Sequence, residues 1–236
     1  MGRLMNVEEF EISGFAVVER VIDQDQVKRL IDALNSHDSN NGDENDPRQY
    51  AKRNLLRLSK VRELAESQAI RSIVDAVLIP GARVVRGLLF DKTPQANWKV
   101  AWHQDLSIAV RERRETHGYG PWSVKAGVQH VQPPAKVLEN MLTIRLHLDD
   151  CGDDNGPLRV IPESHAHGVL DAQQVEQLRE QPAHTCVVGA GGTLVMRPLI
   201  LHASSSASAP RHRRVIHLEY AAMELPGGLE WAEEAS

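Results

Sequence analysis

Two histidines and one aspartate carry the clearest chemical signal in this chain of 236 residues. His103 and Asp105 stand two residues apart in WHQD, and His202 follows about a hundred residues later in LHAS. Residues two apart in a β-strand project from the same face, so His103 and Asp105 would point to one side together. A third ligand from a distant strand would complete a set of two histidines and one carboxylate. Such a set leaves positions on the metal open and is typical of non-haem Fe(II) oxygenases.

The spacing alone does not select this pair. With 11 histidines and 32 acidic residues, chance produces one or two His-x-Asp/Glu pairs in a chain of this length. The sequence contains three of them: His103/Asp105, His147/Asp149 and His217/Glu219. For the second and third pairs, polar strand residues or hydrogen-bonded core histidines are the simpler interpretation. The surrounding sequence therefore has to show which pair binds a metal.

Composition places the chain among ordinary soluble globular proteins, with 42% hydrophobic and 25% charged residues. A net charge of −5 argues against nucleic acid or an anionic membrane surface as a partner. Two cysteines do not make a disulfide framework. The sequence shows no signal-peptide core and no peroxisomal tripeptide. It also has no apolar run long enough to span a membrane. We therefore expect a cytoplasmic protein, of unspecified oligomeric state, that forms one domain over residues 1–236.

The pattern of apolar residues predicts helices first and strands afterwards. A short strand at 14–19 precedes an amphipathic helix that begins after Asp23, and a second helix is expected at about 61–78. The polar stretch 36–50 is predicted to be a surface loop. From 82 to 221 short β-like segments alternate with turns, so the fold class is mainly β, a sandwich or barrel with flanking helices at about 22–78.

Three motifs in order resemble the phytanoyl-CoA dioxygenase family. They are NWKVAWHQD at 97–105, DNGPLRVIPESH at 154–165, and His202 followed by Arg213, and the likeness runs from about residue 14 to 220. The resemblance implies a double-stranded β-helix, or jelly-roll, that uses Fe(II), O₂ and 2-oxoglutarate. Glu163 departs from the pattern, because relatives usually carry glycine at that place in the Pro-x-Ser-His turn.

The resemblance also implies roles for particular residues. It assigns His103, Asp105 and His202 to iron, and Arg213 to the far carboxylate of 2-oxoglutarate, for which a bidentate arginine is well suited. Arg214 would point to the opposite face of its strand, so only one of the two arginines can serve.

Four further positions follow from the same resemblance. Ser204 would help bind the co-substrate carboxylate, and Leu88 would form part of the pocket wall. Lys60 would reach the co-substrate. Arg145 stands where some relatives carry an aromatic residue, and a buried arginine there would contact the co-substrate or an anionic substrate.

The expected activity is hydroxylation, or another oxidation, of a small molecule, coupled to conversion of 2-oxoglutarate to succinate and CO₂. Halogenating relatives replace the carboxylate ligand with a small residue, whereas Asp105 is present here. Residues 36–53 and 110–136 are predicted to cover the substrate, and no cluster of Lys and Arg suited to the phosphates of coenzyme A is evident in the sequence. The alternatives are a cupin-like isomerase or hydrolase that uses Zn or Mn, and a binding module without catalysis.

Overall fold

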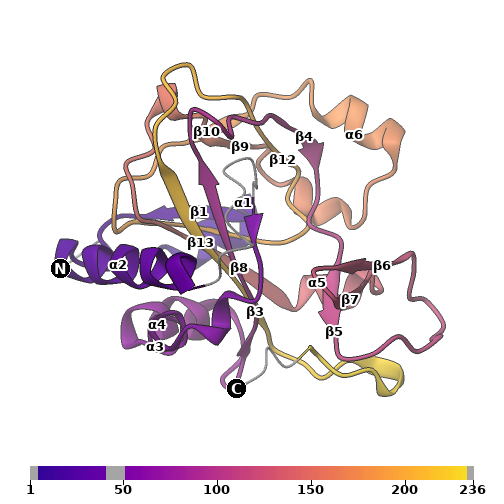
Figure 1. Ribbon diagram of the computed structural model, residues 1–236. Helices are drawn as coiled ribbons and strands as arrows, with labels where there is room; N and C mark the ends of the chain where they lie inside the picture. The colour runs from indigo at the N-terminus through magenta and orange to yellow at the C-terminus, as the bar shows by residue number, and fades with distance from the viewer. Residues whose placement is uncertain (1–4, 41–50, 233–236) are drawn as a thin grey trace.

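The computed structural model describes residues 5–40 and 51–232, and Figure 1 shows the N-terminal helices gathered on one side of a body of β-strands. The α-helices in this part of the chain are α1 (Val7–Ser13), α2 (Gln24–Asn40), α3 (Ser59–Ala65), α4 (Gln68–Val77), α5 (Ala135–Glu139) and α6 (Ala172–Leu178). None of the helices within the described ranges combines the length and apolar character that a membrane crossing needs.

Thirteen strands in the described residues form three antiparallel sheets. A six-stranded sheet has the order β1 (Phe15–Val18), β11 (Thr193–Met196), β8 (Met141–His147), β13 (Arg213–Ala221), β3 (Arg83–Lys92) and β2 (Ala51–Lys52). A four-stranded sheet has the order β10 (His184–Cys186), β9 (Leu158–Val160), β12 (His202–Ser204) and β4 (Val100–His103). The third sheet has the order β5 (Ile108–Val110), β7 (Val128–Val131) and β6 (Trp122–Lys125).

The central strands of the large sheet are buried on both faces, and the two faces differ in chemistry. Side chains alternate along a strand, so Leu142, Ile144 and Leu146 of β8 pack in the same apolar core as α2, α3 and α4. Arg145 and His147, at the alternate positions of the strand, face the other way and are also buried. The sequence of β8 therefore has an apolar face toward the helices and a polar face toward the interior of the β-structure.

The two larger sheets enclose a second apolar cluster. It joins Leu158 and Val160 of β9 and Cys186 of β10 to Leu194 and Met196 of β11. The sheets therefore face each other, with the helices outside, as the sequence predicts for a sandwich or barrel with flanking helices.

Several boundaries differ from those predicted. The helix expected at 61–78 is divided into α3 and α4, because the Ser67 side chain accepts from the backbone N–H of Ile70 and begins a new helix. Residues 36–40 belong to α2 although they were predicted to be loop. The Ser36 hydroxyl donates to the carbonyl of Asp32, so this polar side chain is satisfied within the helix. The rest of the expected loop, 41–50, lies outside the described residues.

Two more regions were not predicted in their observed form. Helix α1 precedes β1 and ends at Gly14, whose φ of 80° allows the left-handed cap that closes a helix. Residues 110–136, predicted to be an irregular cover, contain the paired strands β6 and β7.

Glu163 adopts φ 66°, a left-handed conformation that favours glycine, which explains the glycine expected at this turn.

Candidate active site

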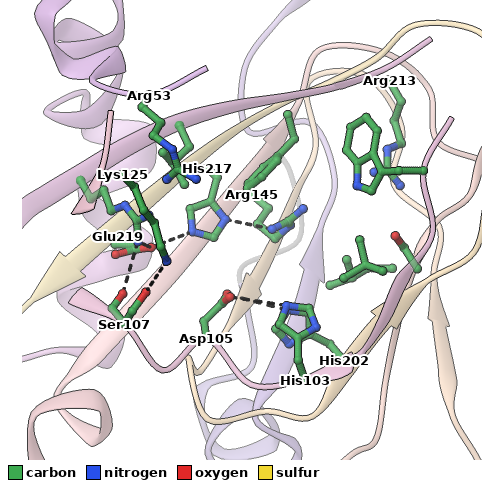
Figure 2. Close-up of a pocket in the computed structure, with 17 residues that line it drawn as sticks. Arg53, His103, Asp105, Ser107, Lys125, Arg145, His202, Arg213, His217 and Glu219 are labelled. Carbon is green, nitrogen blue, oxygen red and sulfur yellow. Dashed lines mark hydrogen bonds and ion pairs between the residues drawn. The ribbon is translucent and has the colours of Figure 1, made fainter. Parts of the chain in front are cut away.

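A pocket of about 450 Å³ lies between the two larger sheets and is lined by both of them (Figure 2). The large sheet contributes residues of β3, β8 and β13, and the smaller sheet contributes residues of β4, β9 and β12. Seven of the eight positions predicted from the sequence line this pocket: Leu88, His103, Asp105, Arg145, His202, Ser204 and Arg213. The eighth, Lys60, does not.

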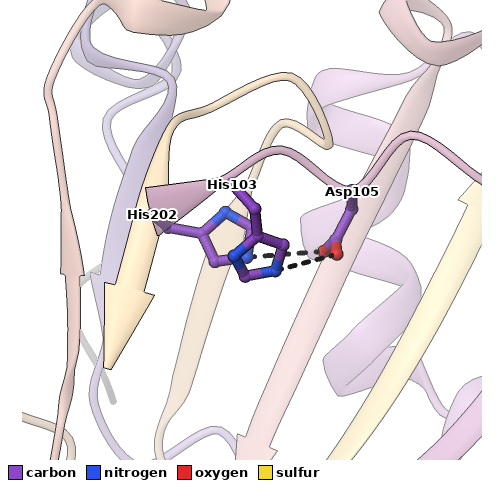
Figure 3. A group of neighbouring side chains, drawn as sticks. All are labelled: His103, Asp105 and His202. Atoms are coloured by element: carbon purple, nitrogen blue, oxygen red, sulfur yellow. Dashed lines mark ion pairs between the residues drawn. The ribbon is translucent and has the colours of Figure 1, made fainter. Parts of the chain in front are cut away.

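The His103, Asp105 and His202 side chains converge at one wall of the pocket (Figure 3). His103 is the last residue of β4 and pairs with His202, the first residue of β12, so strand register brings the two imidazoles together. Asp105 Oδ1 lies 3.7 Å from His103 Nε2, and its Oδ2 lies 3.7 Å from His202 Nε2. One ligand atom from each residue lies within 4.8 Å of the others, which is compatible with a single metal ion.

Backbone contacts orient both imidazole rings toward the carboxylate. The Nδ1 atoms of His103 and His202 lie 2.9 Å from the carbonyl oxygens of Ala101 and Ile200, respectively. A carbonyl oxygen can only accept, so each Nδ1 carries the proton and each Nε2 presents a lone pair. Hydrogen bonds of this type select the tautomer that a metal ligand needs.

The charge states of this cluster also favour a cation. Burial lowers the pKa of His202 to about 4, so this imidazole is neutral at physiological pH although Asp105 partly opposes the shift. Burial of Asp105 favours its protonated form, but electrostatic interactions with His202, His217, His103 and Arg145 outweigh burial and lower the pKa of Asp105. Asp105 Oδ2 is buried and has no hydrogen-bond partner within the described residues. A divalent metal would satisfy this atom, so the three residues fit such an ion.

At another end of the pocket, Arg213 is 3% exposed and its neighbour Arg214 is directed elsewhere. Arg214 pairs with Asp149 at 2.6 Å, whereas the guanidinium of Arg213 donates to the carbonyl of Gly156. The Nε of Arg213 has no partner in the described part of the chain. Of the two candidate arginines, Arg213 is therefore the one on the pocket side.

Lys92 places a second buried cation beside Arg213. Its Nζ donates to Ser204 Oγ at 3.4 Å and to the carbonyl of Ser205. Burial first, and then the charge of Arg213, lower the pKa of Lys92 to about 8. Lys92 does not line the pocket itself, but its charge, together with that of Arg213, favours an anion at this end of the pocket.

Arg145 belongs to a buried chain of polar groups along the pocket wall. Its Nη1 donates to Nδ1 of His217 at 2.9 Å, so the other ring nitrogen of His217 carries the proton and donates to Glu219 at 3.1 Å. Glu219 also accepts from Arg86 at 3.0 Å. The His217/Glu219 pair thus shares a face, as its spacing predicts, but its partners are two arginines.

The remaining pair, His147/Asp149, is also separate from the triad. His147 is 5% exposed and Asp149 is the partner of Arg214. This placement agrees with the interpretation that His147/Asp149 is structural, whereas His217 and Glu219 line the same pocket as the triad.

The prediction that Lys60 reaches the co-substrate was wrong. Its side chain is 52% exposed on α3 and pairs with Glu63 at 2.6 Å, so it does not reach the pocket. The resemblance carried no motif at this position, and a lysine near a helix start is usually solvated.

Sequence reasoning also missed residues that the structure brings to the site. Trp98 lines the pocket and lies beside Lys92, whose Nζ is 5.6 Å from the indole centroid. Arg53, Arg86 and Lys125 line it as well, from three separate parts of the chain. For Lys92 a weak signal was present, since this lysine follows the largely apolar run VVRGLLF by two residues, at the end of β3.

The buried histidines predict how stability depends on pH. Burial, followed by Arg145 and Arg213, lowers the pKa of His147 well below its usual range, and burial with Arg86 lowers that of His130 to about 4. In the unfolded chain both would titrate near the ordinary value of about 6.5. Between these values the unfolded state binds more protons, so the free energy of unfolding decreases as pH falls through this window.

We expect the metal-free protein to lose on the order of 2 kcal/mol or more between pH 7 and pH 5. Chemical denaturation at several pH values measures this loss, and His147→Gln should have a shallower dependence than wild type. If the free energy of unfolding changed equally with pH in the two proteins, His147 would not be a source of the pH dependence.

Comparisons with known proteins cover most of the chain. The family model described as phytanoyl-CoA dioxygenase (PhyH) matches residues 10–215. No match was found among curated proteins. Among solved structures, AviO1 from Streptomyces viridochromogenes Tue57 superimposes with a TM-score of 0.67 at 22% identity, over 93% of this chain and 95% of that one.

Two further structures were solved with bound molecules. EctD from S. alaskensis, with 2-oxoglutarate and 5-hydroxyectoine, has a TM-score of 0.71 at 17% identity, over 92% of this chain and 74% of that one. HygX from Streptomyces hygroscopicus, with nickel and 2-oxoglutarate bound, has a TM-score of 0.67 at 16% identity, over 92% of this chain and 87% of that one. These likenesses confirm the predicted jelly-roll fold. With the family model matched over residues 10–215, the chain belongs to the phytanoyl-CoA dioxygenase family.

Proposed function

We propose that the protein is an Fe(II)- and 2-oxoglutarate-dependent dioxygenase that hydroxylates a small molecule. The observation that carries this proposal is the convergence of His103, Asp105 and His202 on a pocket that also contains a buried arginine, Arg213. Membership of the family and the nickel and 2-oxoglutarate bound by HygX agree with this choice of metal site and co-substrate.

In this proposal His103, Asp105 and His202 hold the metal. Two neutral imidazoles and one carboxylate leave a bound Fe(II) with a net charge of about +1, which attracts an anionic co-substrate. When bound, Fe(II) would supply the redox chemistry by which O₂ is reduced and 2-oxoglutarate is converted to succinate and CO₂.

The protein's own residues bind and orient the co-substrate and the substrate. Arg213 would bind the far carboxylate of 2-oxoglutarate in a charge-assisted hydrogen bond, with Ser204 beside it. Leu88 and Leu158 line the pocket with apolar surface that excludes water. Hydroxylation is preferred over halogenation, because Asp105 occupies the position that halogenating relatives leave without a carboxylate.

Anaerobic titration of the protein with Fe(II) and 2-oxoglutarate tests the proposal. The wild-type protein should develop a weak visible charge-transfer band when both are present, and His103→Ala should not develop it. Lys60→Gln, a change on the exposed face of α3, is the control and should retain the band. Absence of the band in wild type would contradict the proposed function.

A further inference from the structure

Three cations form a cluster on the pocket wall, and the proposed function does not use them. Arg53 follows β2, Arg86 lies on β3 and Lys125 ends β6, and all three line both the main pocket and a small cavity next to it. Figure 2 shows Arg53 and Lys125 on the side of the pocket away from Arg213. We call Arg53, Arg86 and Lys125 the cation cluster.

The cation cluster is only partly neutralised by the protein. Arg86 pairs with Glu219, and the two side chains are 10% and 8% exposed. Lys125 donates to the neutral hydroxyl of Ser107 at 3.2 Å, and within the described residues no ion pair joins Arg53 or Lys125 to a carboxylate. Burial, and then the like charges of Arg86 and Arg53, lower the pKa of Lys125. Such crowding of cations in a cavity favours the binding of an anion.

The position of Ser107 connects this cluster to the metal ligands. Asp105 and Ser107 are two residues apart in the segment that follows β4, and both line the pocket. An anion held at Lys125 and Ser107 would therefore leave the rest of its molecule in the part of the pocket that contains Asp105. In the proposed function, by contrast, the co-substrate has its own cation at Arg213.

We propose that the substrate carries an anionic group, a carboxylate or a phosphate, that Arg53 and Lys125 bind at the cation cluster. Glu219 holds Arg86 in place, and Ser107 adds a hydrogen bond. Arginine can bind either group through two parallel hydrogen bonds, and lysine adds a point charge. This inference rests on the proposed function, since it places 2-oxoglutarate at Arg213.

Calorimetric titration of the full chain, saturated with Ni(II) and 2-oxoglutarate, tests this inference. The probes are inorganic phosphate and acetate, with acetamide as the neutral counterpart of acetate. Phosphate or acetate should bind saturably and acetamide should not. The anion that binds more tightly identifies the group as phosphate or carboxylate.

Two variants locate the binding to the cation cluster. Lys125→Gln and Arg53→Gln should each weaken binding of the preferred anion at least fivefold. Lys60→Gln and Arg179→Gln remove the same charge from exposed positions, one on α3 and one directly after α6, and should leave the affinity unchanged. If Lys125→Gln does not fold, Arg53→Gln alone decides. Wild-type affinity in a folded cluster variant, or equal binding of acetamide and acetate, would overturn the inference.

The two proposals fail in different ways. Binding of Ni(II) and 2-oxoglutarate by the wild-type protein is measured first, and its absence would overturn the proposed function. If Ni(II) and 2-oxoglutarate bound normally but neither phosphate nor acetate bound saturably, only the proposal of an anionic substrate would be overturned.

Discussion

Replacing Asp105 with alanine should weaken metal binding strongly and, with it, decrease the release of succinate. The change removes the single anionic ligand and leaves two neutral imidazoles. Loss of residues that merely orient a metal ligand typically lowers metal affinity about 10- to 100-fold, so loss of the carboxylate itself should cost roughly 100-fold or more. Metal content after dialysis, and succinate formed per enzyme in the presence of a substrate, measure the two effects.

Asp149→Ala is the matched control for this change. Asp149 belongs to another His-x-acid pair, but it binds Arg214 instead of facing the pocket. The variant should retain the metal and form succinate at the wild-type rate, with a modest loss of stability. If Asp149→Ala lost the metal while Asp105→Ala kept it, the choice among the three pairs would be wrong.

The three pairs show what spacing can and cannot predict. A two-residue spacing in extended backbone places both side chains on one face, and His217 and Glu219 do share a face. The spacing does not specify what that face meets, which here is Arg145 and Arg86. Partners are determined by strand pairing across the chain, so only the family resemblance could choose between these pairs.

The same reason explains why the cation cluster was not predicted. No run of lysine and arginine marks it, because Arg53, Arg86 and Lys125 are far apart in sequence. Pairing of β2 with β3, in which Ala51 lies opposite Phe90, brings Arg53 to the pocket wall. A short strand such as β2 has little periodicity to reveal it.

The fold itself was more predictable than its details. The apolar positions of α2 and the alternation in β8 both follow from packing against one core, so they can be recognised locally. The sequence analysis selected Lys60 and did not consider Lys92, since burial of Lys92 depends on neighbours from β12 and the loop after it. The structure places Lys92, and not Lys60, beside Arg213 and Ser204.

Replacing Arg213 with alanine should raise the KM for 2-oxoglutarate roughly 30-fold or more while metal binding is retained. Removing one partner of a buried, hydrogen-bonded charge pair typically costs about 2–5 kcal/mol, and about 1.4 kcal/mol corresponds to a factor of ten. The triad lies elsewhere in the pocket and keeps its own contacts with Ala101 and Ile200. Initial rates of succinate formation across 2-oxoglutarate concentrations, with metal content measured in parallel, separate the two effects.

Arg214→Ala is the control, because Arg214 is adjacent in sequence but binds Asp149 on the other face of β13. Because Arg214 does not face the pocket, the variant should leave the KM for 2-oxoglutarate within about twofold. Its cost should be limited to stability, to which a partly exposed ion pair contributes about 1 kcal/mol or less. The comparison also discriminates between reaction classes. A metal-dependent isomerase or hydrolase on this fold has no dicarboxylate to bind, so Arg213→Ala would leave its activity intact. Equal KM values for the two arginine variants would therefore contradict a co-substrate site at Arg213.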